Sequence, residues 1–137
     1  MAEQLKLEIV TPQQTVLETE ASWVVVPGTE GELGILPEHV PLMTTLGSGV
    51  LQFDREGGVS RVAVHYGYAQ VQSDTVTILA EMAEQADDID VARARDAEQR
   101  ARSELQELIS KQNEEETRIK KCEAKLSRAL VRQSASN

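Results

Sequence analysis

The stretch Glu-Gly-Glu-Leu-Gly-Ile-Leu-Pro-Glu-His-Val-Pro-Leu-Met-Thr-Thr-Leu, residues 30–46, decides how this chain folds. Gly31 and Gly34 lie three positions apart and Pro37 and Pro41 four apart, with apolar residues between them. Glycine permits backbone angles that other residues avoid, whereas proline fixes one angle and removes a hydrogen-bond donor. The stretch therefore predicts short buried strands joined by sharp turns, and it excludes a helix.

Short apolar segments that alternate with polar residues lie on both sides of this stretch. We expect breaks at Gly47-Ser48-Gly49 and at Gly67, which interrupt the apolar runs. Eight to ten short strands at regular spacing are typical of an antiparallel β-sandwich. Its core must be aliphatic, because aromatic residues make up only 3% of the chain. The expected strands before the stretch are 5–9, 15–20 and 22–26, and those after it are 50–55, 59–66, 69–72 and 75–79.

From Ala80 onward the spacing of apolar residues changes to that of a helix. Two stripes recur at three- and four-residue steps, so we expect two amphipathic helices in an antiparallel hairpin, and the fold class is α+β. Their seam is rich in alanine, which buries little area, so the hairpin should be marginal alone and able to leave its resting place. Asp87, Asp88 and Asp90 are candidate N-caps for the first helix, and Asn113 with Glu116 resembles a capping box for the second. The stripes are Ala94, Ala97, Ala101, Leu105 and Leu108, then Ile119, Cys122, Leu126, Ala129 and Leu130.

The charge of the chain changes at the same place. Residues 1–86 carry 12 acidic and 3 basic side chains, whereas residues 87–137 carry 11 of each. The coincidence predicts two domains, residues 1–86 and 87–137. The net charge of −9 disfavours nucleic acid as a partner. No apolar run approaches the roughly 20 residues needed to cross a bilayer, and the first residues lack the features of a signal peptide. A single cysteine fits the cytoplasm, with any membrane association made through other proteins.

The search for catalytic residues finds no active site. His39 and His65 are the only histidines, and neither has a partner at metal-ligand spacing. No nucleophile can be combined with a base by any spacing rule, and residues 28–34 lack the lysine of a phosphate-binding loop. We therefore expect a protein that is not an enzyme and that requires no cofactor.

The chain resembles the epsilon subunit of bacterial-type F-type ATP synthases. Gly31-Glu-Leu-Gly-Ile-Leu-Pro-Glu-His-Val-Pro-Leu42 matches the signature of that family, and Ile89-Asp-Val-Ala-Arg-Ala94 matches the start of its first helix. Leu126-Ser-Arg-Ala-Leu130 matches its last helix. One segment departs from the family, since His65-Tyr-Gly-Tyr68 replaces its usual Ser-Gly-Gly-Phe.

The resemblance implies a rotor subunit at the cytoplasmic face of the bacterial inner membrane. It implies that the subunit joins the gamma subunit to the c-ring during proton-driven ATP synthesis, and that its hairpin extends into the alpha/beta catalytic head to inhibit ATP hydrolysis. On this view His39 faces the gamma subunit, and Glu30, Gly31 and Glu32 lie near the c-ring. The residues alone also allow a purely structural interpretation. In it, His39 forms a hydrogen bond to the backbone within the Pro37–Pro41 turn, and Glu30 and Glu32 are charges exposed to solvent.

The resemblance also implies a regulatory ATP site on the hairpin. Arginine binds phosphate in a bidentate manner, and Arg128 and Arg132 share one helix face because they lie four residues apart. Arg93 at the start of the other helix could converge with them, and Glu84 and Asp90 match positions that contact nucleotide in related subunits. A capping or salt-bridge pair between Asp90 and Arg93 explains that motif equally well.

Basic residues gather near the end of the chain. Residues 117–132 hold six basic side chains and one acidic side chain, in an otherwise acidic protein. A solvated helix face is one interpretation, and contact with an acidic partner is the other. The resemblance supplies such a partner in the beta subunit, to be contacted by Lys120, Lys121, Lys125, Arg128 and Arg132. The alternative to the whole reading is a stand-alone adaptor with a coiled-coil tail, or else a small enzyme whose site is hidden.

Overall fold

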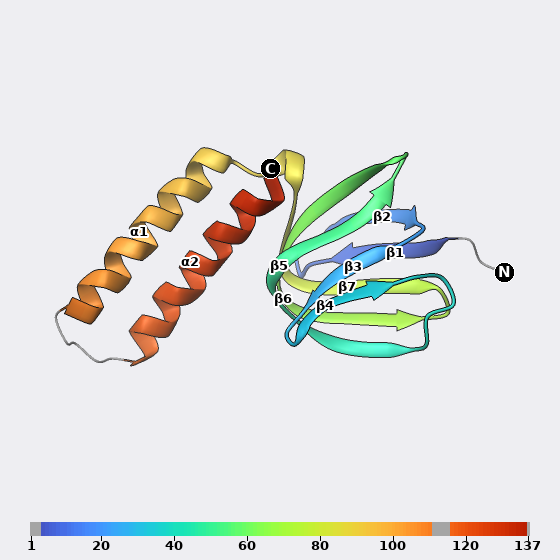
Figure 1. Cartoon of the computed structure of the whole chain (residues 1–137), viewed down its shortest axis with the longest axis horizontal. Coiled ribbons are helices and arrows are strands. Elements are labelled where there is room, and N and C mark those ends of the chain that lie inside the picture. The colour runs from blue at the N-terminus through green and yellow to red at the C-terminus, as the bar shows by residue number, and fades with distance from the viewer. Residues whose placement is uncertain (1–3, 111–115, 137) are drawn as a thin grey trace. The chain divides into compact units, whose positions relative to one another are not determined.

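A computed structural model describes residues 4–110 and 116–136. The chain divides into two compact units, Met1–Asp88 and Ile89–Asn137, which we call the sandwich unit and the helical unit. Figure 1 shows that the first consists mainly of strands and the second of helices. Each unit is described by itself.

The sandwich unit is built from seven strands in one continuous hydrogen-bonded order, β2-β1-β7-β6-β5-β3-β4. All neighbouring pairs are antiparallel except β1 and β7, which run parallel. The strands are β1 Leu5–Val10, β2 Thr15–Ala21, β3 Val24–Gly28, β4 Gly31–Ile35, β5 Leu42–Arg55, β6 Gly58–Gln72 and β7 Thr75–Gln85. A short 3-10 helix, η1, covers Ala86–Asp88.

The core of the sandwich is aliphatic, as the composition predicts. Alternate residues of β1 are fully buried, and the same alternation recurs along β3 and in the first half of β7, whereas β6 buries the four consecutive residues 62–65. Phe53 is the largest of the fully buried side chains. Other members of the core are Leu5, Leu7, Ile9, Val24, Val26, Ile35, Leu51, Val62, Val64, Val76 and Ile78.

The expected number of strands was wrong, because two predicted breaks are absent. β5 continues through Gly47-Ser48-Gly49, and β6 continues through Gly67. At Gly67 the chain bends without ending its pairing: Tyr66 and Gly67 have φ values of 58° and 131°, and Gly67 still pairs with Leu46 and Ala80. Seven strands, of which β5 and β6 are long, therefore replace the expected eight to ten short ones, because glycine can bend a strand as well as end it.

The helical unit contains α1, Val91–Ser110, and α2, Glu116–Ser136. Asp90 caps α1, since its Oδ1 accepts a hydrogen bond from the backbone N of Arg93 at 3.0 Å. The predicted capping box at Asn113 lies outside the described residues. Small side chains form the seam that was expected from the apolar stripes, with Ala94, Ala101, Cys122 and Ala129 buried.

Candidate functional site

The turn between β4 and β5, residues 36–41, is held by the hydrogen bonds of two residues. Glu38 adopts a left-handed conformation, with φ of 69°, and its backbone N donates to Asp74 Oδ1 at 2.6 Å. The backbone N of His39 donates to the carbonyl of Leu36 at 3.1 Å. His39 Nδ1 lies 2.7 Å from the carbonyl oxygen of Val40, which can only accept, so Nδ1 carries the proton in this contact. His39 thus makes the backbone contact that its structural interpretation predicts.

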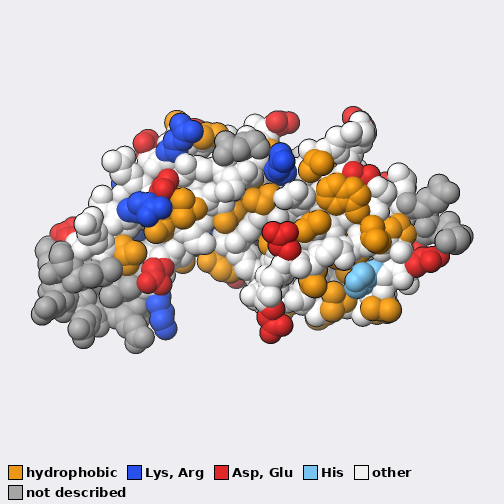
Figure 2. Space-filling view, viewed as in Figure 1, with side chains coloured by type: hydrophobic (Ala, Val, Ile, Leu, Met, Phe, Trp, Pro, Cys, Tyr) orange, Lys and Arg blue, Asp and Glu red, His pale blue; other side chains and the backbone are white. Residues whose placement is uncertain are grey.

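Hydrophobic side chains project from this turn into solvent. Leu36 and Val40 of the turn are 62% and 70% exposed, and Met43, the second residue of β5, is 65% exposed; we call these three residues the apolar turn. On the face shown in Figure 2, hydrophobic side chains are visible at several places on the sandwich unit. Large apolar side chains that are exposed at and beside a turn held by hydrogen bonds are typical of a surface that a partner covers.

Glu30, Gly31 and Glu32 form the tip of a neighbouring hairpin. Gly28 pairs with Gly31, so Thr29 and Glu30 make a two-residue turn between β3 and β4. Gly31 has φ of 130°, a conformation that favours glycine. Glu30 and Glu32 are exposed, so their carboxylates are available to solvent or to a partner.

A second apolar surface, which sequence reasoning missed, lies where β6 bends. A groove of about 360 Å³ is lined by side chains of β1, β6 and β7 together with the residues that follow β1. Tyr68 and Leu79 are about half exposed there, and Pro12 lies beside them. Gly67, where β6 bends, is one of the residues that line this groove. The local sequence pattern instead predicts the end of a strand at this glycine.

The helical unit holds a groove in which positive charges gather. The groove has a volume of about 350 Å³ and lies between α1 and α2. Its basic side chains are Arg100, Lys125, Arg128 and Arg132, and we call it the cationic groove. Ala97, Ala101 and Glu104 complete the lining. The volume falls within the usual range of small-molecule sites, and four cations favour a polyanionic ligand.

Arg128 and Arg132 therefore lie together, as their spacing predicts, and their neighbour on α1 is Arg100. A contact between Glu98 and Gln133 fixes the level of the two antiparallel helices. At a rise of about 1.5 Å per residue, Arg132 is then level with the position just before Arg100, and Arg93 is about 9 Å further along the axis. Arg93 is not among the residues that line the groove.

The remaining predicted site residues occupy other places. Asp90 caps α1 through its side chain, and the bond that it receives comes from the backbone of Arg93 rather than from the guanidinium group. Glu84 belongs to β7 and hence to the sandwich unit. Lys120 and Lys121 are exposed on α2 and do not line the cationic groove, whereas Lys125 does.

A polar cross-link joins the two helices beside this groove. Gln133 Nε2 donates to Glu98 Oε2 at 2.6 Å, and Arg102 Nε donates to Glu98 Oε1 at 3.1 Å. The hydrogen bond from Gln133 is the main cause that lowers the pKa of Glu98, and the bond from Arg102 adds to it. The cross-link ties the last turns of α2 to α1.

Neither a metal-binding cluster nor a membrane-spanning helix is found among the described residues. Within residues 4–110 and 116–136, His, Cys, Asp and Glu form no group of three that could hold a metal ion. In the same ranges, neither helix is long and apolar enough to span a bilayer.

Comparison with known proteins gives matches over the whole chain. Residues 4–86 match the model of the ATP synthase delta/epsilon chain β-sandwich domain, and residues 87–137 match that of its long α-helix domain. The ATP synthase epsilon chain of Geotalea daltonii is 43% identical over 132 residues, which cover 96% of this chain and 93% of the relative. The epsilon chain of Pelotomaculum thermopropionicum is 49% identical over 100 residues, or 73% of this chain and 75% of the relative.

Solved structures show the same fold. A chain in the mitochondrial ATP synthase of Euglena gracilis, solved as an OSCP/F1/c-ring assembly, superposes with a TM-score of 0.83 at 21% identity. The superposition covers all of this chain and 84% of that one. A chain in the central stalk and c-ring structure of the Tetrahymena thermophila mitochondrial ATP synthase gives a TM-score of 0.51 at 16% identity, covering 61% of this chain and 67% of that one.

Proposed function

Because the chain belongs to the ATP synthase delta/epsilon chain family, we propose that it is a non-catalytic central-stalk subunit that joins the gamma subunit to the c-ring. In this role it turns with the rotor at the cytoplasmic face of the membrane. Residues 1–86 form the rotor-binding domain, and residues 87–137 form the regulatory domain. The family follows from the relatives, and the assignment of contacts rests on the exposed surfaces of this chain.

The apolar turn is the observation that carries the rotor-binding role. Burying the exposed parts of Leu36, Val40 and Met43 against a partner would release apolar surface from water at about 25 cal/mol per Å². The bond from Glu38 to Asp74 holds the turn in place, so little order is lost on binding. We assign this surface to the gamma subunit, with His39 beside it, and the Glu30–Glu32 hairpin tip to polar or basic loops of the c-ring.

Association with a gamma subunit tests this assignment. Val40→Asp should abolish co-purification of the full chain with the gamma subunit, because it places a charge in the centre of the buried surface. Val59→Asp is the matched control, since Val59 is 50% exposed at the opposite end of β6 from the turn that contains Asp74. Equal binding by both variants would contradict the assignment, and no binding by the unaltered chain would favour a stand-alone adaptor.

We assign a regulatory role to the helical unit because its basic side chains fit two different acidic partners. In the closed hairpin, Arg128 and Arg132 line the cationic groove, where their guanidinium groups would contact the phosphates of ATP. In an extended hairpin the same two arginines, with Lys120, Lys121 and Lys125, would meet acidic groups of the beta subunit. A nucleotide that occupies the groove therefore competes with inhibition, because both partners use Arg128 and Arg132.

Thermal unfolding tests the nucleotide part. ATP should raise the melting temperature of the full chain through mass action on the closed form. Arg128→Ala should reduce that shift, whereas Arg95→Ala, which removes an exposed arginine of α1 outside the groove, should not. An unchanged melting curve at millimolar ATP would contradict nucleotide binding.

Salt dependence of ATP hydrolysis tests the inhibitory part. Exposed ion pairs each contribute about 0.2–1 kcal/mol and are screened over about 10 Å at 0.1 M salt. Replacing Lys120, Lys121, Lys125, Arg128 and Arg132 by Gln should relieve inhibition in the assembled complex while assembly persists. Added salt should relieve inhibition in the parent more than in this variant. Equal inhibition by both proteins across the salt range would favour steric insertion of the helix.

A further inference from the structure

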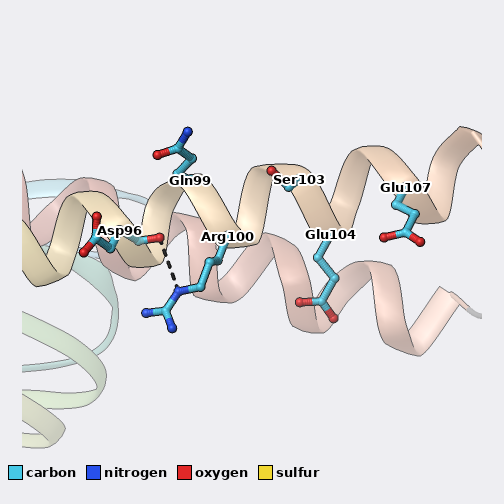
Figure 3. A pocket seen from close by; sticks show the side chains of 6 residues that line it. All are labelled: Asp96, Gln99, Arg100, Ser103, Glu104 and Glu107. Atoms are coloured by element: carbon cyan, nitrogen blue, oxygen red, sulfur yellow. Dashed lines mark hydrogen bonds between the residues drawn. The ribbon is translucent and has the colours of Figure 1, made fainter.

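One carboxylate lies among the four basic side chains of the cationic groove. Glu104 is the single acidic residue in the described lining, opposite Lys125, Arg128 and Arg132 of α2. It follows Arg100 by one helical turn, so both side chains leave α1 on the same face. Figure 3 shows Arg100 and Glu104 extending to the side of α1 on which the ribbon of α2 runs.

No close contact neutralises this carboxylate among the residues that the structure describes. Arg100 directs its Nε to the backbone oxygen of Asp96 at 3.4 Å, rather than to Glu104. Arg102 pairs with Glu98 on another face of the helix. Glu104 is exposed and makes no hydrogen bond or salt bridge within the described ranges. Its charge therefore acts across the groove on whatever binds there.

We propose that Glu104 sets the affinity of the cationic groove for polyphosphate by repelling the bound phosphates. The inference rests on the proposed nucleotide site and adds a residue that weakens it. Repulsion by one fixed charge grows with the charge of the ligand, so Glu104 penalises ATP more than ADP. The charge of Glu104 thereby raises the ATP concentration at which the groove is half occupied.

The expected effect follows from Coulomb's law in a water-filled groove. ATP free of magnesium carries about four negative charges. Removing the negative charge of Glu104 from its vicinity should therefore tighten binding about 3- to 30-fold. The lower end applies at physiological salt and the upper end at low salt, because mobile ions screen the interaction. The gain for ADP should be smaller at every salt concentration.

Calorimetric titration of the full chain with ATP and with ADP, at low and high salt, tests the proposal. Glu104→Gln removes the charge and keeps the size and helix propensity of the side chain. Glu123→Gln is the matched control, because it removes the same charge from an exposed position of α2 outside the groove. Adding Arg128→Ala to Glu104→Gln should cancel the gain if it arises in the groove.

The outcomes separate this proposal from the one on which it rests. Tighter binding by Glu104→Gln alone, larger for ATP than for ADP and smaller at high salt, is the expected result. If the parent binds ATP and Glu104→Gln binds no more tightly than Glu123→Gln, nucleotide binding stands and the role of Glu104 is wrong. If neither the parent nor Glu104→Gln binds ATP, the groove is not a nucleotide site and both proposals fail.

Discussion

Among the glycines, Gly67 is the one at which an added Cβ would come closest to another atom, so Gly67→Ala should destabilise the sandwich strongly. A Cβ at this position would lie 1.9 Å from the carbonyl oxygen of Leu79 and 2.9 Å from the Cα of Ala80. Both atoms belong to the backbone of β7, which pairs with β6 at this point. No side chain can rotate away, so β7 itself must move to admit a methyl group.

The size of the effect has two parts that a control separates. Gly67 has φ of 131° and Gly57 has φ of 82°, so alanine at either position adopts a left-handed backbone, at about 1–2 kcal/mol. At Gly57 nothing lies within 4 Å of the added Cβ. Overpacking adds about 1–3 kcal/mol at Gly67 alone. We therefore expect Gly57→Ala to lower the free energy of unfolding by about 1–2 kcal/mol, and Gly67→Ala by about 2–5 kcal/mol.

Urea unfolding followed by tryptophan fluorescence measures this difference. Trp23 is the only tryptophan of the chain and lies beside β3, so its emission reports the sandwich unit rather than the helices. In thermal unfolding, each 1 kcal/mol should lower the midpoint by about 4–8 °C for a domain of this size. If Gly67→Ala destabilises the protein no more than Gly57→Ala does, the close approach of β6 and β7 is not what requires glycine.

Two further predictions concern groups with lowered pKa values. Asp54 accepts hydrogen bonds from the hydroxyl and the backbone N of Ser22 and from the backbone N of Trp23, and the hydroxyl is the main cause that lowers its pKa. The stabilising contribution of the Asp54 carboxylate is therefore complete above the unfolded pKa near 3.8, and it is lost as the pH falls through the lower folded pKa. Asp54→Asn should lower the free energy of unfolding at pH 7 by about 1 kcal/mol. In urea unfolding measured at several pH values, the variant should lose less stability than the parent as the pH falls. Gln133→Leu should raise the pKa of Glu98 toward 4.5, measured by NMR titration, and an unchanged value would mean that the cross-link between the helices does not form in solution.

The sequence could predict those elements that depend on local patterns. The alternation in residues 5–9 gave β1, and Asp90 was among the predicted caps of α1. The breaks at residues 47–49 and at Gly67 were wrong, because a glycine that bends a paired strand has the same local signature as one that ends it. The parallel pairing of β1 with β7 joins segments about 70 residues apart, and no local pattern encodes it.

The cationic groove could be predicted only in part, for a related reason. Arg128 and Arg132 lie four apart on one helix, so their shared face follows from the helical period alone. Which residue of α1 faces them depends on the level at which two antiparallel helices pack. That level is fixed by tertiary contacts such as the one between Glu98 and Gln133. The sequence alone therefore does not distinguish Arg100 and Glu104 from the other charged residues of α1.

The bond between Glu38 and Asp74 gives the sandwich a mechanical property. The turn at residues 36–41 joins the edge strand β4 to β5, and Asp74 lies in the turn between β6 and β7. A force applied to that turn is therefore transmitted to β4 and β5 through the chain, and to β6 and β7 through the hydrogen bond to Asp74. β5 and β6 pair at 13 positions, with hydrogen bonds perpendicular to the strands, so a pull along them loads many bonds in shear instead of peeling them singly. The sandwich should therefore resist a force that is applied at this turn and directed along β5 and β6.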